Sequence, residues 1–159
     1  MAPKFESGSD LRTIWKAKAH AILVACPNLV SPQDAADARV VSGFPAIVGT
    51  KSRVPSGYPL ANPKGRLTFK CTIAASQPST QLTIAMQRHG VTGCLDICAA
   101  PAIKTGSLMP ILEERFRIPL EIRLMTPHRR KTSSDKPLIE AMSKMMDAHD
   151  RLTGSQSAK

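Results

Sequence analysis

The chain has 159 residues, 42% of them hydrophobic and 21% charged, which suits one soluble domain with a packed core. No apolar run approaches the roughly 20 residues of a membrane-spanning helix, so we expect no membrane partner and a cytoplasmic location. The formal net charge of +10 favours contact with nucleic acid or another polyanion, although a solvated basic surface is the simpler explanation.

Motifs for catalysis or cofactor binding are missing from the sequence. It contains no glycine-serine-glycine nucleophile elbow, no phosphate-binding glycine loop and no dinucleotide fingerprint. The four cysteines, Cys26, Cys71, Cys94 and Cys98, include no CxxC pair of the kind that binds zinc. Cys26 and Cys71 lie in apolar runs and are predicted to be buried, reduced thiols. We therefore expect no enzyme, no catalytic residue, no metal site and no cofactor.

The first part of the chain predicts a leader, a strand and a short helix. Residues 1–10 are polar and read as a flexible leader, and the mixed segment Leu11 to Lys18 can extend into the first strand. His20 to Cys26 is a compact apolar run that predicts a buried strand. Ser31 to Asp34 has the pattern of a helix start, with serine as cap and proline at the first position, and this helix is predicted to end near Ala38. Strand character returns at Phe44 to Val48.

The middle of the chain predicts a loop, a strand, a helix and another strand. Residues 49–64 are rich in proline and glycine, which indicates a loop or an irregular hairpin. Gly65 to Ile73 alternates apolar and polar residues, the pattern of a half-buried strand. Residues 79–89 have helical periodicity and are predicted to stop at Gly90. Val91 to Ile97 is a short strand candidate.

The last part of the chain predicts a strand and a helix. Alternation from Leu120 to Met125 indicates a strand that ends at Pro127, followed by the basic turn His128 to Lys131. Pro137 to Met146 predicts a helix with five apolar side chains on one stripe: Leu138, Ile139, Met142, Met145 and Met146. The alternation of strands and helices predicts an α/β fold with a mainly parallel or mixed sheet.

Several of these segments carry a family resemblance through their order and spacing. They are the strand entry Pro63 to Leu67, the helix end and strand start Gly90 to Gly93, the turn Ile103 to Leu108, the strand Leu120 to Arg130 and the helix Pro137 to Met146. Together with Ile22 to Leu29 upstream, they resemble the C-terminal portion of the effector-binding (substrate-binding) domain of LysR-type transcriptional regulators. The sequence departs from the family pattern at Thr92, where glycine is usual, and at Cys26, where serine is usual.

The resemblance covers about Ala21 to Met146 and implies a fold. That fold is α/β, a periplasmic-binding-protein-like (type 2) lobe with a mixed sheet. The other lobe of the domain, to which the last strand and helix return, is incomplete. The expected organisation is a leader (1–10), the second lobe of the effector-binding domain (11–118), a strand and helix that return to the first lobe (119–150), and a tail (151–159). The helix-turn-helix of the family is not expected in this chain.

The expected effector site combines two loops. Ser76, Gln77, Ser79 and Thr80 lie between a strand end and a helix start, where backbone N–H groups are free and hydroxyls can converge on an anion. The resemblance implies that this loop faces the cleft between the lobes, and that Asp96 and Ile97, at the end of the next strand, face it too. Ordinary turn and capping chemistry is the competing interpretation.

The function implied by the resemblance is that of an effector-sensing module that binds a small, anionic molecule. Such a module reaches DNA only through a domain absent from this chain, and two copies can pair through the C-terminal strand and helix. Two alternatives stay open, namely a basic nucleic-acid-binding protein of another class and a truncated gene product without independent function.

Overall fold

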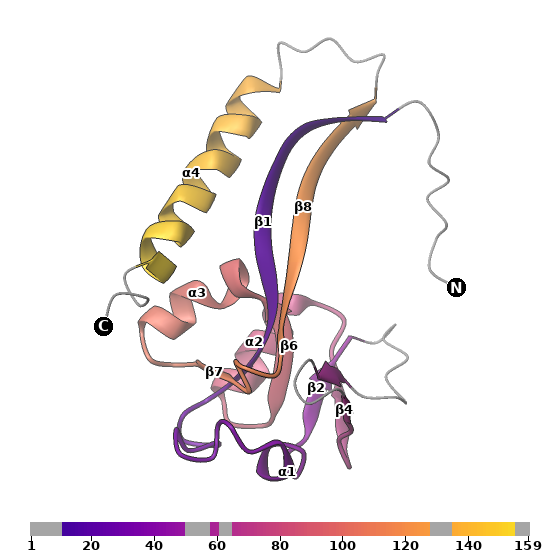
Figure 1. Cartoon of the computed structure of the whole chain (residues 1–159), viewed down its shortest axis with the longest axis vertical. Helices are drawn as coiled ribbons and strands as arrows, with labels where there is room; N and C mark the ends of the chain where they lie inside the picture. The colour runs from indigo at the N-terminus through magenta and orange to yellow at the C-terminus, as the bar shows by residue number, and fades with distance from the viewer. Residues whose placement is uncertain (1–10, 50–57, 61–64, 128–134, 155–159) are drawn as a thin grey trace. The chain divides into compact units, whose positions relative to one another are not determined.

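The computed structural model describes residues 11–49, 58–60, 65–127 and 135–154. The chain forms two compact units: unit 1 contains Met1–Ala19 and Leu120–Lys159, and unit 2 contains His20–Pro119. Figure 1 gives the elements in chain order. The predicted leader (1–10), the basic turn (128–131) and residues 155–159 of the predicted tail lie outside the described residues.

Unit 2 is built on a mixed sheet with the strand order β5-β2-β6-β1-β7. Three neighbouring strands, β2 (Ala46–Val48), β5 (Thr72–Ala74) and β6 (Val91–Leu95), are parallel, with β2 between β5 at the edge and β6. β1 (Leu11–Ala25) pairs antiparallel with β6 and with β7 (Met109–Ile111). The predicted α/β class with a mixed sheet is therefore confirmed.

The apolar run in β1 is buried on both faces of the sheet. Ile22 and Val24 belong to one hydrophobic cluster, and Leu23 and Ala25 to another, because successive strand residues point to opposite faces. Each large apolar side chain that is buried in this way contributes roughly 1.5–3 kcal/mol. The predicted buried strand is thus confirmed, and it extends back to Leu11.

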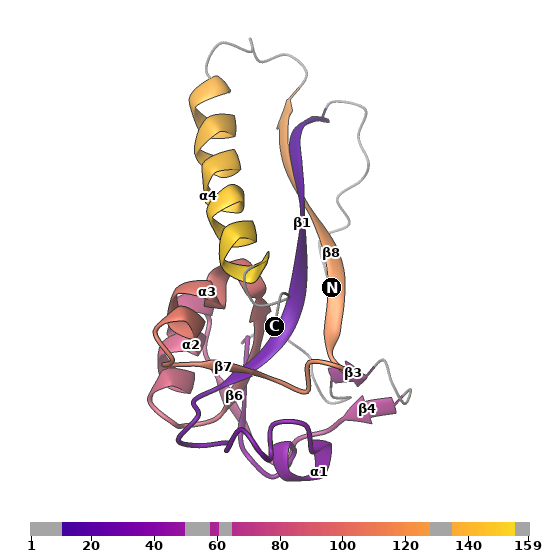
Figure 2. The same cartoon turned by 60° about the vertical axis from the view of Figure 1, so that its left-hand side comes forward.

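Helices cover one face of this sheet and short elements cover the other. On the first face lie α2 (Pro78–Met86) and α3 (Asp96–Lys104), as Figure 2 shows. On the second face, α1 (Ala38–Val41) packs with the hairpin of β3 (Tyr58–Leu60) and β4 (Gly65–Leu67). The sequence predicted a loop or irregular hairpin at 49–64, and β3–β4 forms such a hairpin.

Unit 1 combines a two-stranded ribbon with the last helix. The strand β8 (Arg117–Pro127) pairs with β1, and α4 (Lys136–Gly154) lies beside the ribbon in Figures 1 and 2. Trp15 Nε1 on β1 donates a hydrogen bond to Ser143 Oγ on α4 over 3.2 Å. The predicted C-terminal strand and helix are confirmed, but the helix runs past Met146 to Gly154, into the segment predicted to be a tail.

The helix predicted from Ser31 to Ala38 is wrong. Residues 32–36 form turns, and α1 begins at Ala38 with Asp37 as its cap. Ser31 does pair with Asp34, with Oγ donating to the Asp34 carboxylate over 2.8 Å and accepting from its backbone N–H over 3.2 Å. It closes a turn instead of a helix, because serine and aspartate side chains satisfy the backbone equally well in turns.

The single strand predicted from Gly65 to Ile73 is also wrong. The segment splits into β4, which pairs with β3, and β5, which pairs with β2, so its two ends belong to different sheets. Cys71 lies in the connection between them and is exposed, whereas Cys26 is buried as predicted. Alternation over nine residues did not reveal that the two ends have different pairing partners.

The end of α2 differs from the expected glycine stop. The helix ends at Met86, and Arg88, with φ of 67°, adopts the left-handed conformation that glycine was expected to provide. Gly90 serves close packing instead, because a Cβ at this position would lie 2.4 Å from the carbonyl oxygen of Pro45. The helical periodicity of residues 79–89 predicted one apolar face through Leu82, Ala85, Met86 and His89. Of these, Ala85 is buried and Leu82 is half-buried, whereas Met86 and His89 are exposed.

The apolar stripe predicted on α4 is only partly buried. Met146 is 6% exposed, and Ile139 and Met142 are half-buried. Leu138 and Met145 are 48% and 46% exposed. The helix therefore buries one apolar face within unit 1 and leaves part of the predicted stripe uncovered in this chain.

Candidate effector-binding site

The parallel strands bring the two predicted loops to one edge of the sheet. Because β2 pairs in parallel with both β5 and β6, the carboxyl ends of all three strands point the same way. Residues 76–80 follow β5, and Asp96 and Ile97 follow β6 directly. Neighbouring strands lie about 4.8 Å apart, so the two groups start roughly 10 Å from each other, on either side of Val48. Ligands of open α/β sheets bind at such edges.

The predicted residues after β5 form the N-terminal end of α2. Gln77 is the N-cap residue, Pro78 takes the first position, and Ser79 and Thr80 lie in the first turn. Ser76, Gln77, Ser79 and Thr80 are all exposed. The side chain of Gln77 makes no capping hydrogen bond, and no acidic residue lies in the first turn. This helix end therefore presents backbone N–H groups and hydroxyls without a negative charge of its own.

Two side chains that the sequence did not single out hold this turn in place. Gln81 Nε2 donates to the carbonyl oxygen of Ala75 over 2.9 Å, which ties the helix back to the end of β5. Thr83 Oγ1 donates to the carbonyl oxygen of Ser79 over 3.0 Å. A glutamine near the start of a helix is common on protein surfaces, so nothing in the sequence marked Gln81 as a positioning residue.

Asp96 is placed differently from the exposed loop. It opens α3 instead of ending a strand, and its side chain is 7% exposed. One carboxylate oxygen accepts from the backbone N–H of Ile97 over 2.9 Å, and the other lies 3.1 Å from Nδ1 of His20 on β1. Asp96 therefore supplies the negative charge at the start of α3 itself. The sequence did not identify His20, because the β1–β6 register that aligns it with Asp96 is a long-range pairing.

Two cysteines flank Asp96. Cys94 is at the end of β6, and burial raises the pKa of its thiol to about 12, with smaller contributions from Cys98 and Asp96. Burial and then Asp96 also raise the pKa of Cys98, which is exposed on α3. Both thiols therefore stay protonated at neutral pH and are poor nucleophiles.

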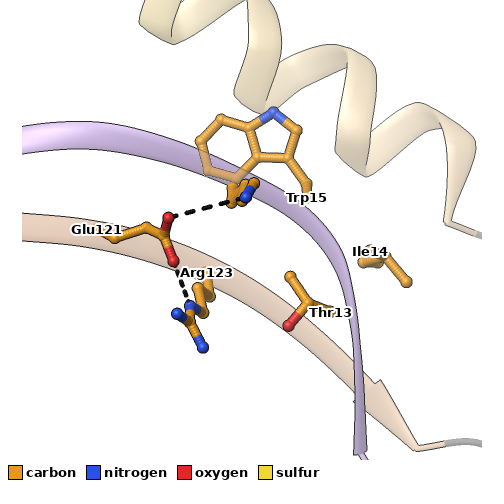
Figure 3. A pocket seen from close by; sticks show the side chains of 6 residues that line it. Thr13, Ile14, Trp15, Glu121 and Arg123 are labelled. Atoms are coloured by element: carbon orange, nitrogen blue, oxygen red, sulfur yellow. Dashed lines mark hydrogen bonds and ion pairs between the residues drawn. The ribbon is translucent and has the colours of Figure 1, made fainter.

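A separate cavity of about 460 Å³, which was not predicted from the sequence, lies on the ribbon of unit 1. Figure 3 shows Thr13, Ile14 and Trp15 from β1 with Glu121 and Arg123 from β8. Arg123 donates a hydrogen bond to the exposed Glu121 carboxylate and lowers its pKa. Lys16, also in the lining, is 4.0 Å from the same carboxylate. These charges are already paired with one another, which leaves little to recognise a ligand.

Neither a metal site nor a membrane-spanning helix occurs in the part of the chain that the structure describes. No group of three or more histidine, cysteine, aspartate or glutamate side chains there is arranged to hold a metal ion. None of the helices in the same residues is both long enough and apolar enough to cross a membrane.

No protein-family model matches the chain, and no curated protein matches it. Solved structures do match. CrgA, a LysR-type transcriptional regulator from Neisseria meningitidis, superposes with a TM-score of 0.61 at 12% identity, over 92% of this chain and 50% of that chain. HypT, a hypochlorite-specific LysR-type regulator from Salmonella typhimurium, gives a TM-score of 0.57 at 14% identity, over 87% and 47%.

The match also holds for an isolated regulatory domain. The CrgA regulatory domain superposes with a TM-score of 0.59 at 14% identity, over 92% of this chain and 71% of that domain. The chain thus spans about half the length of the full-length regulators that it matches. It has the fold of the regulatory domains of LysR-type transcriptional regulators, as the resemblance in the sequence predicted.

Proposed function

We propose that this chain is the effector-sensing module of a LysR-type regulator and binds a small anionic molecule at the N-terminal end of α2. The observation that carries the proposal is the placement of Ser76, Gln77, Ser79 and Thr80, all exposed, at the carboxyl edge of three parallel strands. The fold shared with LysR regulatory domains supports the sensing role. The exposed hydroxyls and the first-turn N–H groups supply the donors that an anion needs.

The difference between the two helix ends at this edge supports an anionic ligand at α2. Asp96 already places a carboxylate at the start of α3, where it accepts the N–H of Ile97. The first turn of α2 contains no acidic residue, and the side chain of its N-cap residue is not used for capping. An anion is therefore stabilised by the dipole of α2 and is repelled less there than beside Asp96.

The proposed role in regulation follows from linkage between two sites. In an intact regulator, an effector in the cleft between the lobes would favour one arrangement of the lobes and thereby change the grip of the oligomer on DNA. In this chain, Ser76 to Thr80 with Asp96 and Ile97 would form one wall of that cleft. Contact with DNA would belong to a separate domain.

Thermal unfolding and calorimetric titration with small acids test the proposal. We expect at least one member of a panel of small inorganic and organic anions to raise the unfolding temperature. The combined substitution Ser79→Ala and Thr80→Ala should weaken its binding, because each lost hydrogen bond costs about 1 kcal/mol, or roughly fivefold in affinity.

The matched control removes a hydroxyl elsewhere in unit 2. Thr105 caps the other end of α3, where its Oγ1 donates to the carbonyl oxygen of Ala102 over 3.1 Å. Thr105→Ala should leave the affinity for the anion unchanged. Binding that is insensitive to the α2 substitutions, or a panel in which no anion binds, contradicts the proposed site.

A further inference from the structure

Three polar side chains of unit 1 come together where helix α4 begins. Arg12 is on β1, Thr126 is on β8, and Asp135 immediately precedes α4. Figure 1 shows the end of β8 beside the start of β1, so Arg12 and Thr126 are at the same end of the ribbon. Their neighbours Leu11 and Met125 are exposed, and successive strand residues point to opposite faces, so Arg12 and Thr126 point inward. We call Arg12, Thr126 and Asp135 the polar cluster.

The hydrogen-bonding groups of the polar cluster are largely unused. Nη2 of Arg12 lies 3.5 Å from Oδ2 of Asp135, which makes an ion pair but is too long for a good hydrogen bond. Within the described residues, four buried atoms of the cluster have no hydrogen-bond partner: Nε and Nη2 of Arg12, Oγ1 of Thr126 and Oδ2 of Asp135. A polar atom that loses water and gains no protein partner destabilises the state in which it is buried.

The middle of α4 is attached to unit 1 by contacts of another kind. Met146 is buried and Met142 is half-buried, so this part of the helix gains from the burial of apolar surface. Ser143 accepts the hydrogen bond of Trp15 Nε1. The middle of α4 is therefore packed with its polar groups satisfied, whereas the start of the helix is packed over polar atoms that are not.

We propose that the first two turns of α4 open locally from the ribbon while Met146 and the rest of unit 1 stay packed. Opening returns water to the four buried atoms of the polar cluster, which offsets part of the packing that is lost. The ion pair between Arg12 and Asp135 opposes the opening, because the two charges attract each other more strongly at the closed separation than in water. The start of α4 is thus a gate over one end of the ribbon, and this ion pair controls how often it opens.

Amide hydrogen exchange of the whole chain, followed by NMR, tests this opening. In an α-helix, the amides of residues 142–144 bond to the carbonyls of 138–140, near the start of α4, and residues 150–152 are equally far from its end. A helix that frays evenly protects both sets alike. Once the first turns lose their packing they are too short to stay helical in water, so we expect residues 142–144 to exchange at least tenfold faster than 150–152.

Two variants of the polar cluster should change this exchange in opposite directions. The triple variant Arg12→Met, Thr126→Val and Asp135→Leu replaces the cluster with apolar side chains, an exchange that buried ion pairs tolerate or gain from. It should slow the exchange of residues 142–144 roughly tenfold and leave 150–152 within about threefold. Asp135→Asn removes only the charge and leaves Arg12 without its counter-ion, so it should speed the exchange of residues 142–144 roughly tenfold.

The matched control, Asp147→Asn, removes one charge from the exposed side of α4 and should leave the exchange of both sets unchanged. Protection of the amides in β1 and β6 of unit 2 separates local opening from global unfolding, because only global unfolding changes it. If the triple variant does not fold, Thr126→Val alone removes one of the four buried atoms, keeps the ion pair and should slow exchange about threefold.

Equal protection of residues 142–144 and 150–152 in the unaltered chain overturns the proposal. A folded triple variant, or a folded Thr126→Val variant, in which residues 142–144 exchange as fast as in the unaltered chain also overturns it. An equal change in Asp147→Asn and Asp135→Asn would show that the charge of α4 as a whole, and not the polar cluster, controls the helix.

Discussion

At the scale of single residues, glycine at position 90 is required by close packing against the segment before β2. A Cβ at Gly90 would lie 2.4 Å from the carbonyl oxygen of Pro45 and 3.2 Å from the side chain of Ile47. Gly90→Ala should therefore force β6 away from the segment before β2 and lower the free energy of unfolding by about 2–3 kcal/mol. Denaturant unfolding measures this loss.

Gly106 provides the contrasting case. It has φ of 74°, and a Cβ there would meet nothing within 4 Å. Gly106→Ala should lower the free energy of unfolding by about 1 kcal/mol, because alanine adopts the left-handed conformation less readily than glycine. If the two variants lose equal stability, the close approach at Gly90 is not what makes glycine necessary. The sequence predicted a special role for Gly90, but as a helix stop, because the contact with Pro45 depends on a strand pairing that is distant in sequence.

At the scale of elements, the proline in α2 and the proline in α3 have different effects on the stability of their helices. Pro101 is inside α3 and lacks the N–H that would bond the preceding turn, whereas Pro78 is in the first turn of α2, where the N–H has no helical acceptor. Pro101→Ala should therefore raise the free energy of unfolding by about 1–2 kcal/mol. Pro78→Ala should change it by less than about 0.5 kcal/mol or lower it slightly. Thermal unfolding of both variants checks the contrast, and equal effects would contradict it.

The sequence predicted a strand or helix correctly where its hydrophobic pattern ran over several consecutive residues. The buried run at Ile22 to Ala25 and the alternation in β8 both became strands, and the helix from Pro137 was found. The helix α3 was not predicted at all, because it follows β6 without an intervening loop and contains Pro101. The segment from Gly65 to Ile73 was predicted as one strand because the sequence does not show which strands its two ends pair with.

The candidate site was predictable to the extent that it is local. Ser76 to Thr80 were predicted between a strand and a helix, and the structure has Ser76 and Gln77 there, whereas Ser79 and Thr80 lie in the first turn of α2. The partner of Asp96 could not be predicted, because His20 is 76 residues away along the chain. The cavity beside Trp15 was missed for the same reason, since its lining comes from β1 and β8.

At the scale of the whole molecule, the net charge of +10 predicts a general attraction to DNA. If the chain is a sensing module, as proposed, this attraction should lack sequence preference and fall steeply as salt rises. Fluorescence anisotropy with unrelated DNA duplexes at low and physiological salt measures it. Binding that favours one sequence and survives physiological salt would support a nucleic-acid-binding protein of another class instead.

The central claim, that a small anion binds at the start of α2, is tested most directly by NMR. Amide spectra of the labelled chain would be recorded during titration with the small acids that raise its unfolding temperature. We expect the largest and saturable shifts at the N–H groups of Ser79 and Thr80, with smaller shifts at Ile97, because these amides line one edge of the sheet. Shifts that instead gather around Trp15 and Arg123, or that never saturate, would contradict the account.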